Sequence, residues 1–301
     1  MIRERGFVEP LLEKYPLNVV WADVCERLEE EDLLAVVSDL DGIICGDDRL
    51  TSKVYDRAAK LKVVVKWGTG IDSINKEEAE KRNISVFRTP GAFTEPVADS
   101  TLAYILAFCR NVVGNDKILK EGGWDKPKGY SLFERTVGII GLGDIGNAVA
   151  KRLRAFGADI IAYDIAASDV SFFNPHGVRM VEKEEILFRS DFISLHCDLN
   201  DSSYQTLKAA DFRRMERFPF VLNMARGALI EEKALIEALE REKIVGAALD
   251  VFEEEPLPLS SPLRNMDHVF LASHNSNSSP KCWEDVHRHS LKMLMKGLGF
   301  E

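Results

Sequence analysis

Short apolar runs alternate with polar stretches of helical spacing over the first hundred residues. Three of these runs have the length and composition of buried strands or their approaches: Leu17–Trp21, Leu33–Ser38 together with Gly42–Cys45, and Leu61–Lys66. Ser52–Lys60 is typical of a helix, capped by Thr51 or Ser52. This alternation predicts a parallel α/β sheet in the first part of the chain.

Two helices frame this region. Phe7–Tyr15 fits a first helix, and Pro96–Asn111 is a long apolar helix that follows a short strand at Ile84–Phe87. The second helix is too rich in alanine and aliphatic residues for an exposed position, so we expect it to bridge two domains.

The centre of the chain has the pattern of a complete βαβ unit. Its strands are Thr136–Ile140 and Ile160–Asp164, with the helix Asn147–Phe156 between them. Further alternation predicts strands at Asp191–His196, Phe220–Asn223, Gly246–Val251 and Val269–Ala272, and helices at Lys233–Glu240 and Pro280–Met295. The second half therefore predicts a second, larger parallel sheet.

A glycine-rich turn joins the first strand of that βαβ unit to its helix. It reads Gly141-Leu142-Gly143-Asp144-Ile145-Gly146, and Asp164 follows the last glycine by eighteen residues. Such a turn brings the backbone close to a pyrophosphate at the helix N-terminus, and the later acid accepts from the ribose hydroxyls. A carboxylate at Asp164 would repel a 2′-phosphate, so the pattern predicts NAD rather than NADP.

Composition narrows the class of protein. The 301 residues suggest about two domains, and a net charge of −10 argues against a nucleic-acid partner. No apolar run reaches the length of a membrane span. The five cysteines, Cys25, Cys45, Cys109, Cys197 and Cys282, are scattered without metal-site spacing. We expect reduced thiols in a cytoplasmic protein, and no metal ion.

Four further segments carry a family resemblance. Along the chain they are Lys66–Asp72, Asn223–Ile230 with its N-x-x-R-G pattern, Gly246–Pro256 with L-D-V-F-x-x-E-P, and the pair Ser273-His274. In this order, and with Thr89-Pro90-Gly91 and Val97-Ala98-Asp99 between the first two, the segments resemble the D-isomer-specific 2-hydroxyacid dehydrogenases. The resemblance covers nearly the whole chain from about Leu17.

The resemblance implies an α/β fold of two Rossmann- or flavodoxin-like doubly wound parallel-sheet domains with a cleft between them. Residues 1–95 with 280–301 would form a discontinuous substrate domain, and residues 96–279 the NAD-binding domain. It also implies a homodimer, to whose interface Gly122-Gly123-Trp124 would contribute, and no membrane partner.

The implied activity is hydride transfer between NAD and a small D-2-hydroxy or 2-keto acid. Arg226 would hold the carboxylate and polarise the carbonyl bidentately, aided by Lys66 and the backbone N–H groups of Thr69 and Gly70. His274 would act as acid and base, because an imidazole titrates near working pH. Glu255 would orient the ring and stabilise its protonated form.

Cofactor contacts are implied for a wider set of residues. Besides Asp164, these are Gly141, Gly143, Asp144, Ile145 and Gly146 of the turn, and Thr101, His196, Cys197, Ala225, Asp250 and Asn277 elsewhere. Asp250 would hold the nicotinamide carboxamide, and Thr101 would lie on the phosphate side.

Some positions depart from the family pattern. Asp144 stands where many relatives carry arginine beside the pyrophosphate, which weakens the expected NAD affinity. Ser273 replaces a proline. Asn277 replaces a glycine, and its tolerance of left-handed geometry would preserve the turn. Members commonly begin with a strand, whereas here the first helix comes at once, so we expect a first domain without that strand or a chain that starts late.

The acidic turn Cys45-Gly46-Asp47-Asp48-Arg49 bears on the substrate. Its aspartates would repel a phosphate unless Arg49 or Lys66 compensates, which favours unphosphorylated acids such as glyoxylate or hydroxypyruvate. Alternatives remain: a D-3-phosphoglycerate dehydrogenase, a non-catalytic NAD-sensing interaction protein of the same fold, and a decayed enzyme.

Overall fold

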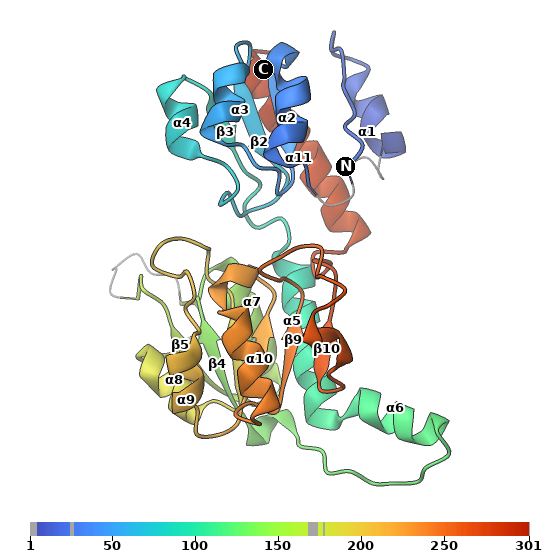
Figure 1. Ribbon diagram of the computed structural model, residues 1–301, viewed down its shortest axis with the longest axis vertical. Helices are drawn as coiled ribbons and strands as arrows, with labels where there is room; N and C mark the ends of the chain where they lie inside the picture. Colours follow the sequence, from blue (N-terminus) through green and yellow to red (C-terminus); the bar gives the residue numbers. More distant parts are fainter. Residues whose placement is uncertain (1–4, 25–26, 168–173, 177, 301) are drawn as a thin grey trace. The chain divides into compact units, whose positions relative to one another are not determined.

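The computed structural model describes residues 5–24, 27–167, 174–176 and 178–300. The chain divides into two compact units (Figure 1), and each is described by itself. Unit 1 comprises residues 1–93 and 278–301, and unit 2 comprises residues 94–277. The boundaries expected from the sequence, after residues 95 and 279, lie two residues further along the chain. Cys25 falls outside the described residues.

Unit 2 is built on a seven-stranded parallel sheet with the order β10-β9-β8-β7-β4-β5-β6. The strands are β4 (Thr136–Ile140), β5 (Asp159–Tyr163), β6 (Arg179–Met180), β7 (Phe192–Leu195), β8 (Phe220–Asn223), β9 (Gly246–Leu249) and β10 (Val269–Leu271). The central strands are almost continuous apolar runs because both faces of the sheet are covered.

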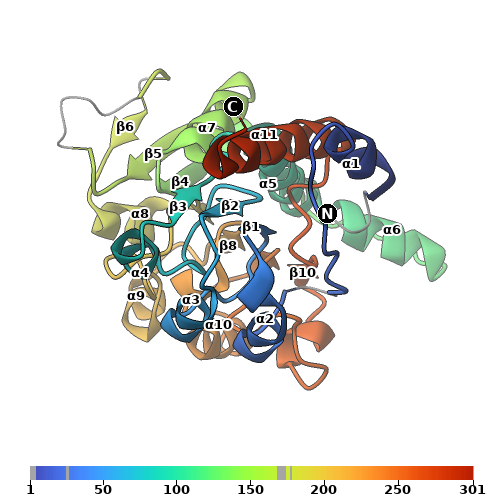
Figure 2. The same ribbon diagram turned by 90° about the horizontal axis from the view of Figure 1, so that it is seen from above.

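Helices cover both faces of the unit 2 sheet (Figure 2). One layer holds α5 (Thr94–Arg110) and α7 (Asp144–Ala155), and the other holds α8 (Lys183–Arg189), α9 (Ala209–Arg214) and α10 (Glu232–Glu240). Ile186, Phe212 and Leu235 of the second layer pack with Ile193 and Val221 of the sheet in one buried cluster. The predicted bridging helix α5 lies wholly in unit 2, where Phe108 stacks on Phe220 and Phe270.

Unit 1 has a three-stranded parallel sheet with the order β1-β2-β3. Its elements are α1 (Arg5–Leu12), α2 (Glu30–Val36), β1 (Gly42–Cys45), α3 (Ser52–Arg57), β2 (Val63–Lys66), α4 (Lys76–Lys81), β3 (Ser85–Phe87) and α11 (Pro280–Leu298). α11 packs on β1 and β2 with α1 beside it, while Leu33, Val54 and Ala79 of α2, α3 and α4 share a cluster with Val64. The predicted α/β fold with parallel sheets is confirmed.

One predicted strand of unit 1 is a helix. Leu33–Ser38 was expected to be extended, but α2 covers Glu30–Val36 and a 3₁₀ turn follows at Val37–Asp39. Two local features account for the difference. The N-terminal turn is acidic and Asp32 accepts from the Glu29 N–H in a capping box, while Leu33 and Val37 share one buried helical face.

A second predicted strand, Leu17–Trp21, forms neither helix nor strand. Val19 and Val20 lie at the surface, 41% and 58% exposed, while Leu17 and Trp21 are half-buried. A strand needs a neighbour to complete its hydrogen-bonded ladder, and composition alone does not supply one.

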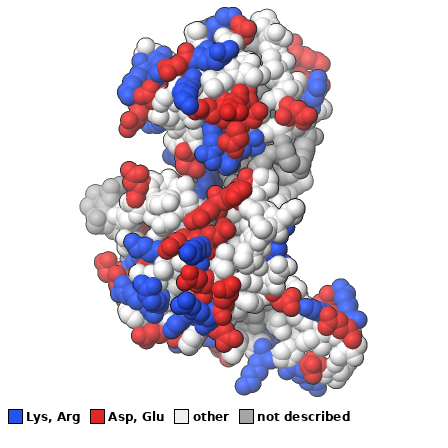
Figure 3. Space-filling view, viewed as in Figure 1, with Lys and Arg blue, Asp and Glu red and all other residues white. Residues whose placement is uncertain are grey.

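An arm projects from the body of unit 2 (Figure 1). It consists of α6 (Val112–Lys120), none of whose residues is buried, and residues 121–130, a turn followed by a segment without helix or strand, which are all exposed. No helix among the described residues has the length and hydropathy to span a membrane. On the face drawn in Figure 3, acidic and basic side chains are interleaved over both units.

Candidate active site

The glycine turn lies where the strand order of unit 2 reverses, between β4 and β7. Gly141 has a φ of +93°, and a Cβ there would lie 2.4 Å from the backbone nitrogen of Cys197, which follows β7. Glycine is therefore required both by the left-handed conformation and by the close approach of the two chains. In doubly wound sheets this switch point at the carboxyl ends of the strands is the ligand site.

The residues around this turn fit a dinucleotide. The side of Gly143 on which a Cβ would lie is open, with no atom within 4 Å, so a pyrophosphate has room at the N-terminus of α7. Asp164 accepts from the backbone N–H groups of Leu142 (2.8 Å) and Ala166 (2.8 Å), which fixes its carboxylate beside the turn. Asp144 is exposed in the first turn of α7, with the half-buried Ile145 next to it.

Arg226 lies in a turn after β8 that Asn223 organises. The Asn223 side chain accepts from the Ala225 N–H (3.1 Å) and donates to the Arg226 carbonyl (2.8 Å). A Cβ on Gly227 would lie 1.9 Å from the carbonyl group of Phe252, so only glycine permits this contact. The N-x-x-R-G and L-D-V-F segments are thus packed backbone against backbone.

Glu255 and His274 form a hydrogen-bonded pair. The Nδ1 atom of His274 lies 3.0 Å from Oε2 of Glu255, and both side chains are largely buried, with exposed fractions of 22% and 16%. The other carboxylate oxygen, Oε1, accepts from the Phe252 N–H (2.9 Å), so the loop that packs on Gly227 also holds Glu255. Because the carboxylate of Glu255 occupies Nδ1 of the His274 ring, Nε2 is the ring nitrogen that can exchange a proton with a substrate.

The loop that carries His274 is held by Asp250. The buried carboxylate of Asp250 accepts from the backbone N–H groups of Asn275 (2.7 Å) and Ser276 (2.9 Å). The backbone carbonyl of Asp250 accepts from the His274 N–H (2.8 Å). His274 has a φ of +49°, a left-handed conformation that costs energy for a side chain of its size. The left-handed residue of this described loop is therefore His274, and not Asn277 as expected.

The remaining cofactor candidates lie at the ends of β7 and within α5. Burial lowers the pKa of His196 to about 4, and its Nε2 lies 2.8 Å from the Ser194 hydroxyl. Burial raises the pKa of Cys197 to about 11, so this thiol is neutral. The Thr101 hydroxyl is buried and donates to the Val97 carbonyl one turn earlier in α5 (2.8 Å).

In unit 1 the loop after β2 is fixed by Thr89. Its hydroxyl accepts from the Gly68 N–H (2.9 Å) and donates to the Gly68 carbonyl (3.0 Å), and its own carbonyl accepts from the Thr69 hydroxyl (3.3 Å). Within the described residues, no hydrogen bond engages the backbone N–H of Thr69 or Gly70. Lys66, the last residue of β2, is 3% exposed.

Three positioning residues carry weak sequence signals. Asn223 and Gly227 belong to the N-x-x-R-G pattern, but their roles follow only from the contacts with Arg226 and Phe252. Thr89 had a signal only as part of a Thr-Pro-Gly turn after a strand.

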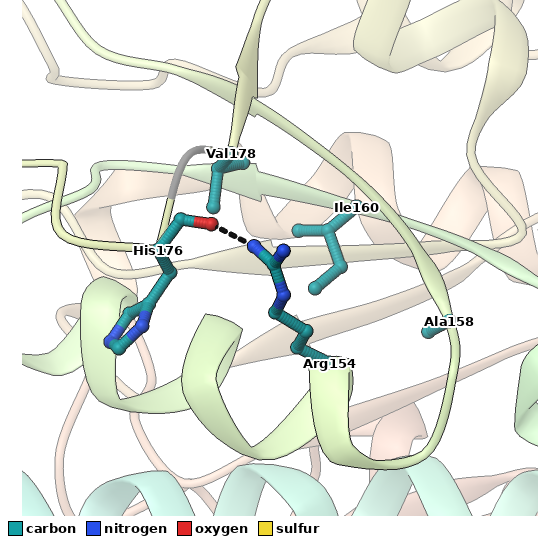
Figure 4. A pocket seen from close by; sticks show the side chains of 5 residues that line it. All are labelled: Arg154, Ala158, Ile160, His176 and Val178. Atoms are coloured by element: carbon teal, nitrogen blue, oxygen red, sulfur yellow. Dashed lines mark hydrogen bonds between the residues drawn. The ribbon is translucent and has the colours of Figure 1, made fainter.

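A small surface pocket lies elsewhere in unit 2. Arg154, Ala158, Ile160, His176 and Val178 line about 160 Å³ at the amino ends of β5 and β6, and the Arg154 guanidinium donates to the His176 carbonyl across it (Figure 4). This is the end of the sheet opposite to the glycine turn. Among the described residues, no group of three or more His, Cys, Asp or Glu is arranged to hold a metal ion.

Residues 102–276 match the family model described as "D-isomer specific 2-hydroxyacid dehydrogenase, NAD binding domain". The chain belongs to this family. It is 39% identical over 257 residues to a glyoxylate reductase of Thermofilum pendens, covering 83% of this chain and 76% of that one. The predicted NAD-binding Rossmann domain, and NAD as the cofactor of this dehydrogenase, are thereby confirmed.

Two further relatives show the range of the family. A D-3-phosphoglycerate dehydrogenase of Methanocaldococcus jannaschii is 39% identical over 283 residues, which are 91% of this chain but 53% of the relative. The structure of an NAD-dependent formate dehydrogenase from Staphylococcus aureus in complex with NAD has a TM-score of 0.81 at 28% identity, with coverages of 90% and 83%. This dehydrogenase therefore shares its fold with an NAD-dependent enzyme named for formate, and its sequence family with enzymes named for other substrates.

Proposed function

We propose that this dehydrogenase interconverts a small unphosphorylated 2-keto acid and the corresponding D-2-hydroxy acid. The observation that carries the proposal is the pair His274–Glu255, with Nδ1 and Oε2 3.0 Å apart, because the loop that carries Glu255 packs through Phe252 against Gly227, the residue after Arg226. An acid–base pair linked in this way to the turn of an arginine matches what the reduction of a keto acid requires.

Each group has a distinct part in the reaction. Arg226 binds the carboxylate and polarises the carbonyl, which a planar guanidinium does with two parallel hydrogen bonds. His274 donates the Nε2 proton to the oxygen as the carbonyl is reduced, and takes a proton back in the reverse direction. Glu255 fixes the tautomer and the ring plane through Nδ1. The N–H groups of Thr69 and Gly70 bind the substrate carboxylate, and unit 1 acts as the substrate domain.

NAD is held by unit 2. The glycine turn and the N-terminus of α7 take the pyrophosphate, while Asp164 accepts from the adenosine ribose hydroxyls. Ala225, His196 and Cys197 line the same strand ends, and Asp250 with Asn277 lies on the nicotinamide side. When bound, NADH supplies the hydride. A carboxylate at Asp164 opposes a 2′-phosphate, so NADH is the preferred donor.

A second candidate substrate is phosphorylated. The 39% identity to a D-3-phosphoglycerate dehydrogenase favours it, although this chain covers 53% of that relative. Glyoxylate and hydroxypyruvate are the better candidates, because several relatives named for these substrates match 76–90% of their own lengths.

The experiment is a panel of 2-keto acids with NADH and NADPH side by side, followed by the loss of reduced-cofactor absorbance. We expect turnover of glyoxylate or hydroxypyruvate and a preference for NADH. Binding of NADH without turnover of any acid would favour an NAD-sensing interaction protein, and failure to bind NADH would favour a decayed enzyme.

We also propose a homodimer that forms through the arm, residues 112–130. Apolar side chains along the arm are exposed in the single chain, including Val112 (54%), Val113 (53%) and Trp124 (79%). Exposed apolar patches of this kind are typical of surfaces that bind a partner. Light scattering should give a dimer for the natural chain and a larger share of monomer for Trp124→Ser with Val113→Ser. A monomeric natural protein would refute the proposal.

A further inference from the structure

Trp67 is the first residue after β2 and stands directly before the loop 68–70. Its backbone N–H donates to the Cys45 carbonyl (2.8 Å), which continues the ladder between β1 and β2. Its indole N–H donates to Nδ1 of His287 in α11 (2.9 Å), 220 residues further along the chain. A residue of the last helix thus holds the side chain with which this loop begins.

The indole of Trp67 also packs against two other rings. Its centroid lies 5.1 Å from that of Phe93 and 5.3 Å from that of His287, with interplanar angles of 54° and 40°. Phe7 of α1 in turn packs against His287, with 6.1 Å between the centroids. Tilted contacts at these distances are favourable between aromatic rings. Packing therefore fixes where the indole lies, and the hydrogen bond to His287 fixes how it is turned.

His287 makes this hydrogen bond as a neutral, buried ring. The residue is 1% exposed, and burial lowers its pKa to about 4. A ring that accepts at Nδ1 carries its proton at Nε2, and this atom is buried without a hydrogen-bond partner among the described residues. Because an unpaired buried donor lowers stability, stability alone does not account for a histidine here. The bond to Trp67 is what distinguishes His287 from an apolar residue of similar size.

The loop that follows Trp67 has a second anchor at Gly68. Gly68 has a φ of +139°, and the Thr89 hydroxyl binds both its N–H and its carbonyl. Thr69 and Gly70 come next and are half-buried. Two backbone N–H groups bind one carboxylate together only if both point at the same place, which the conformation of the loop decides. Trp67 fixes the chain at the start of that loop.

We propose that His287 is a positioning residue for the substrate: through Trp67 it holds the loop 68–70 so that the N–H groups of Thr69 and Gly70 meet the substrate carboxylate. The inference rests on the proposed function and deepens it. The carboxylate is bound alike in the keto acid and in the transition state, so misplaced N–H groups raise KM and leave kcat unchanged. The pair Trp67–His287 therefore contributes to substrate affinity and not to the chemical step.

The test variant is His287→Leu, which removes the acceptor and keeps an apolar side chain of similar size. The measurements are KM and kcat for glyoxylate and hydroxypyruvate with NADH, and the inhibition constant of oxamate, a 2-keto acid analogue that is not reduced. We expect KM and the inhibition constant to rise about tenfold, with kcat within about twofold of the natural value. His287→Asn, whose Oδ1 can accept from the indole, should return KM to within about threefold.

Trp67→Phe removes the donor at the other end of the hydrogen bond. This variant should raise KM by a similar factor. The double variant of Trp67→Phe with His287→Leu should lose no more than either single variant, because both changes break the same interaction. An unchanged KM in a folded Trp67→Phe overturns the proposal, even where His287→Leu does not fold.

Val286→Ala is the matched control. Val286 directly precedes His287 in α11 and is also 1% exposed, so its truncation leaves a cavity and lowers the Tm. The hydrogen bond between His287 and Trp67 stays in place, and KM should therefore stay within about twofold of the natural value. An equal rise of KM in Val286→Ala would show that any loosening of α11 has this effect, and it would overturn the positioning role.

The possible failures are distinguishable. If the natural enzyme reduces these acids and a folded His287→Leu keeps the natural KM, the positioning role is overturned while the proposed function stands. A fall of kcat at an unchanged KM also overturns it, since the pair would then act in the chemical step. A natural enzyme that binds NADH but neither reduces these acids nor binds oxamate overturns both proposals.

Discussion

The loops at the strand ends of the two units are held by different chemistry. In unit 2, the carboxylates of Asp164, Asp250 and Glu255 each accept from backbone N–H groups. In unit 1, Asp48 and Lys66 hold the turn after β1 with charged groups as well, whereas the loop after β2 is held by the neutral hydroxyl of Thr89. Charge-assisted bonds to backbone are the stronger kind, so the comparison indicates that the loops of unit 2 are held more firmly than the loop after β2 in unit 1.

The largest expected effect concerns proton transfer, which we propose for His274 of unit 2. His274→Gln should lower kcat by about 10³-fold, because no other group replaces the proton donor at Nε2. NADH affinity, measured by fluorescence titration, should stay within about threefold. His289→Gln, at an exposed position of α11 in unit 1, is the control and should keep full turnover. Turnover that persists in His274→Gln would place the acid elsewhere.

The next effect concerns the guanidinium. Arg226→Ala should lower kcat/KM by about 10²- to 10³-fold, since it removes an electrostatic clamp on the reacting carbonyl. Arg226→Lys keeps the charge without the bidentate geometry and should recover only part of the loss. Steady-state kinetics with glyoxylate measure kcat/KM for both variants. A loss below tenfold for Arg226→Ala would contradict the proposed role of Arg226 in holding the carbonyl.

The pH dependence of the free energy of unfolding tests both units together, because each unit holds a buried neutral histidine. Burial lowers the pKa of His196 in unit 2 and of His287 in unit 1 to about 4. The unfolded chain binds these protons at its ordinary pKa near 6.5. The free energy of unfolding therefore falls as the pH drops from about 6.5 to 4, by about 2 kcal/mol per histidine between pH 7 and 5.

Urea unfolding at pH 7 and 5 measures this slope. His196→Gln should reduce the acid loss of unit 2, and His287→Gln should do the same for unit 1. In unit 1 the Trp67 indole N–H donates to Nδ1 of the neutral ring (2.9 Å), which protonation would prevent. A slope that does not change in either variant would contradict burial of the neutral form.

A smaller effect on the free energy of unfolding distinguishes the charged hydrogen bonds of Asp250 from the neutral ones of Thr89. Asp250→Asn weakens two charge-assisted bonds and should cost about 2 kcal/mol of unfolding free energy. Thr89→Val removes neutral hydroxyl bonds of similar number and should cost about 1 kcal/mol. Thermal or urea unfolding measures both. Equal costs would remove the distinction drawn between the units.

The smallest effect concerns Asp144 at the start of α7. An acid in the first helical turn competes with a pyrophosphate for the positive end of the helix dipole. Asp144→Arg should raise NADH affinity about fivefold at low salt, and the gain should shrink as salt is added. Glu216→Arg, the same reversal at an exposed site before β8, should not change the affinity. An affinity for NADH that Asp144→Arg lowers would contradict the argument.

The sequence alone determined the elements with strong local patterns. The strand Phe220–Asn223 has the predicted ends, and α10 begins one residue before its prediction, because a continuous apolar run and an amphipathic period each have few alternatives. The glycine turn could also be predicted from the sequence, because the spacing of its three glycines matches a fixed backbone geometry between a strand and a helix. The prediction was wrong at Leu33–Ser38, where a short apolar run fits the periodicity of a helix as well as that of a strand. In the structure a capping box at Glu29 starts a helix there.

Only the tertiary structure decided which partner each polar group takes. The sequence could not show that Asp250 binds the backbone after His274, that the left-handed residue is His274 rather than Asn277, or that Lys66 is neutralised by Asp47. These contacts join residues 19 to 26 positions apart. Local propensity acts over one turn of helix or a pair of strand residues, whereas such pairings arise only after the sheets bring the strand ends together.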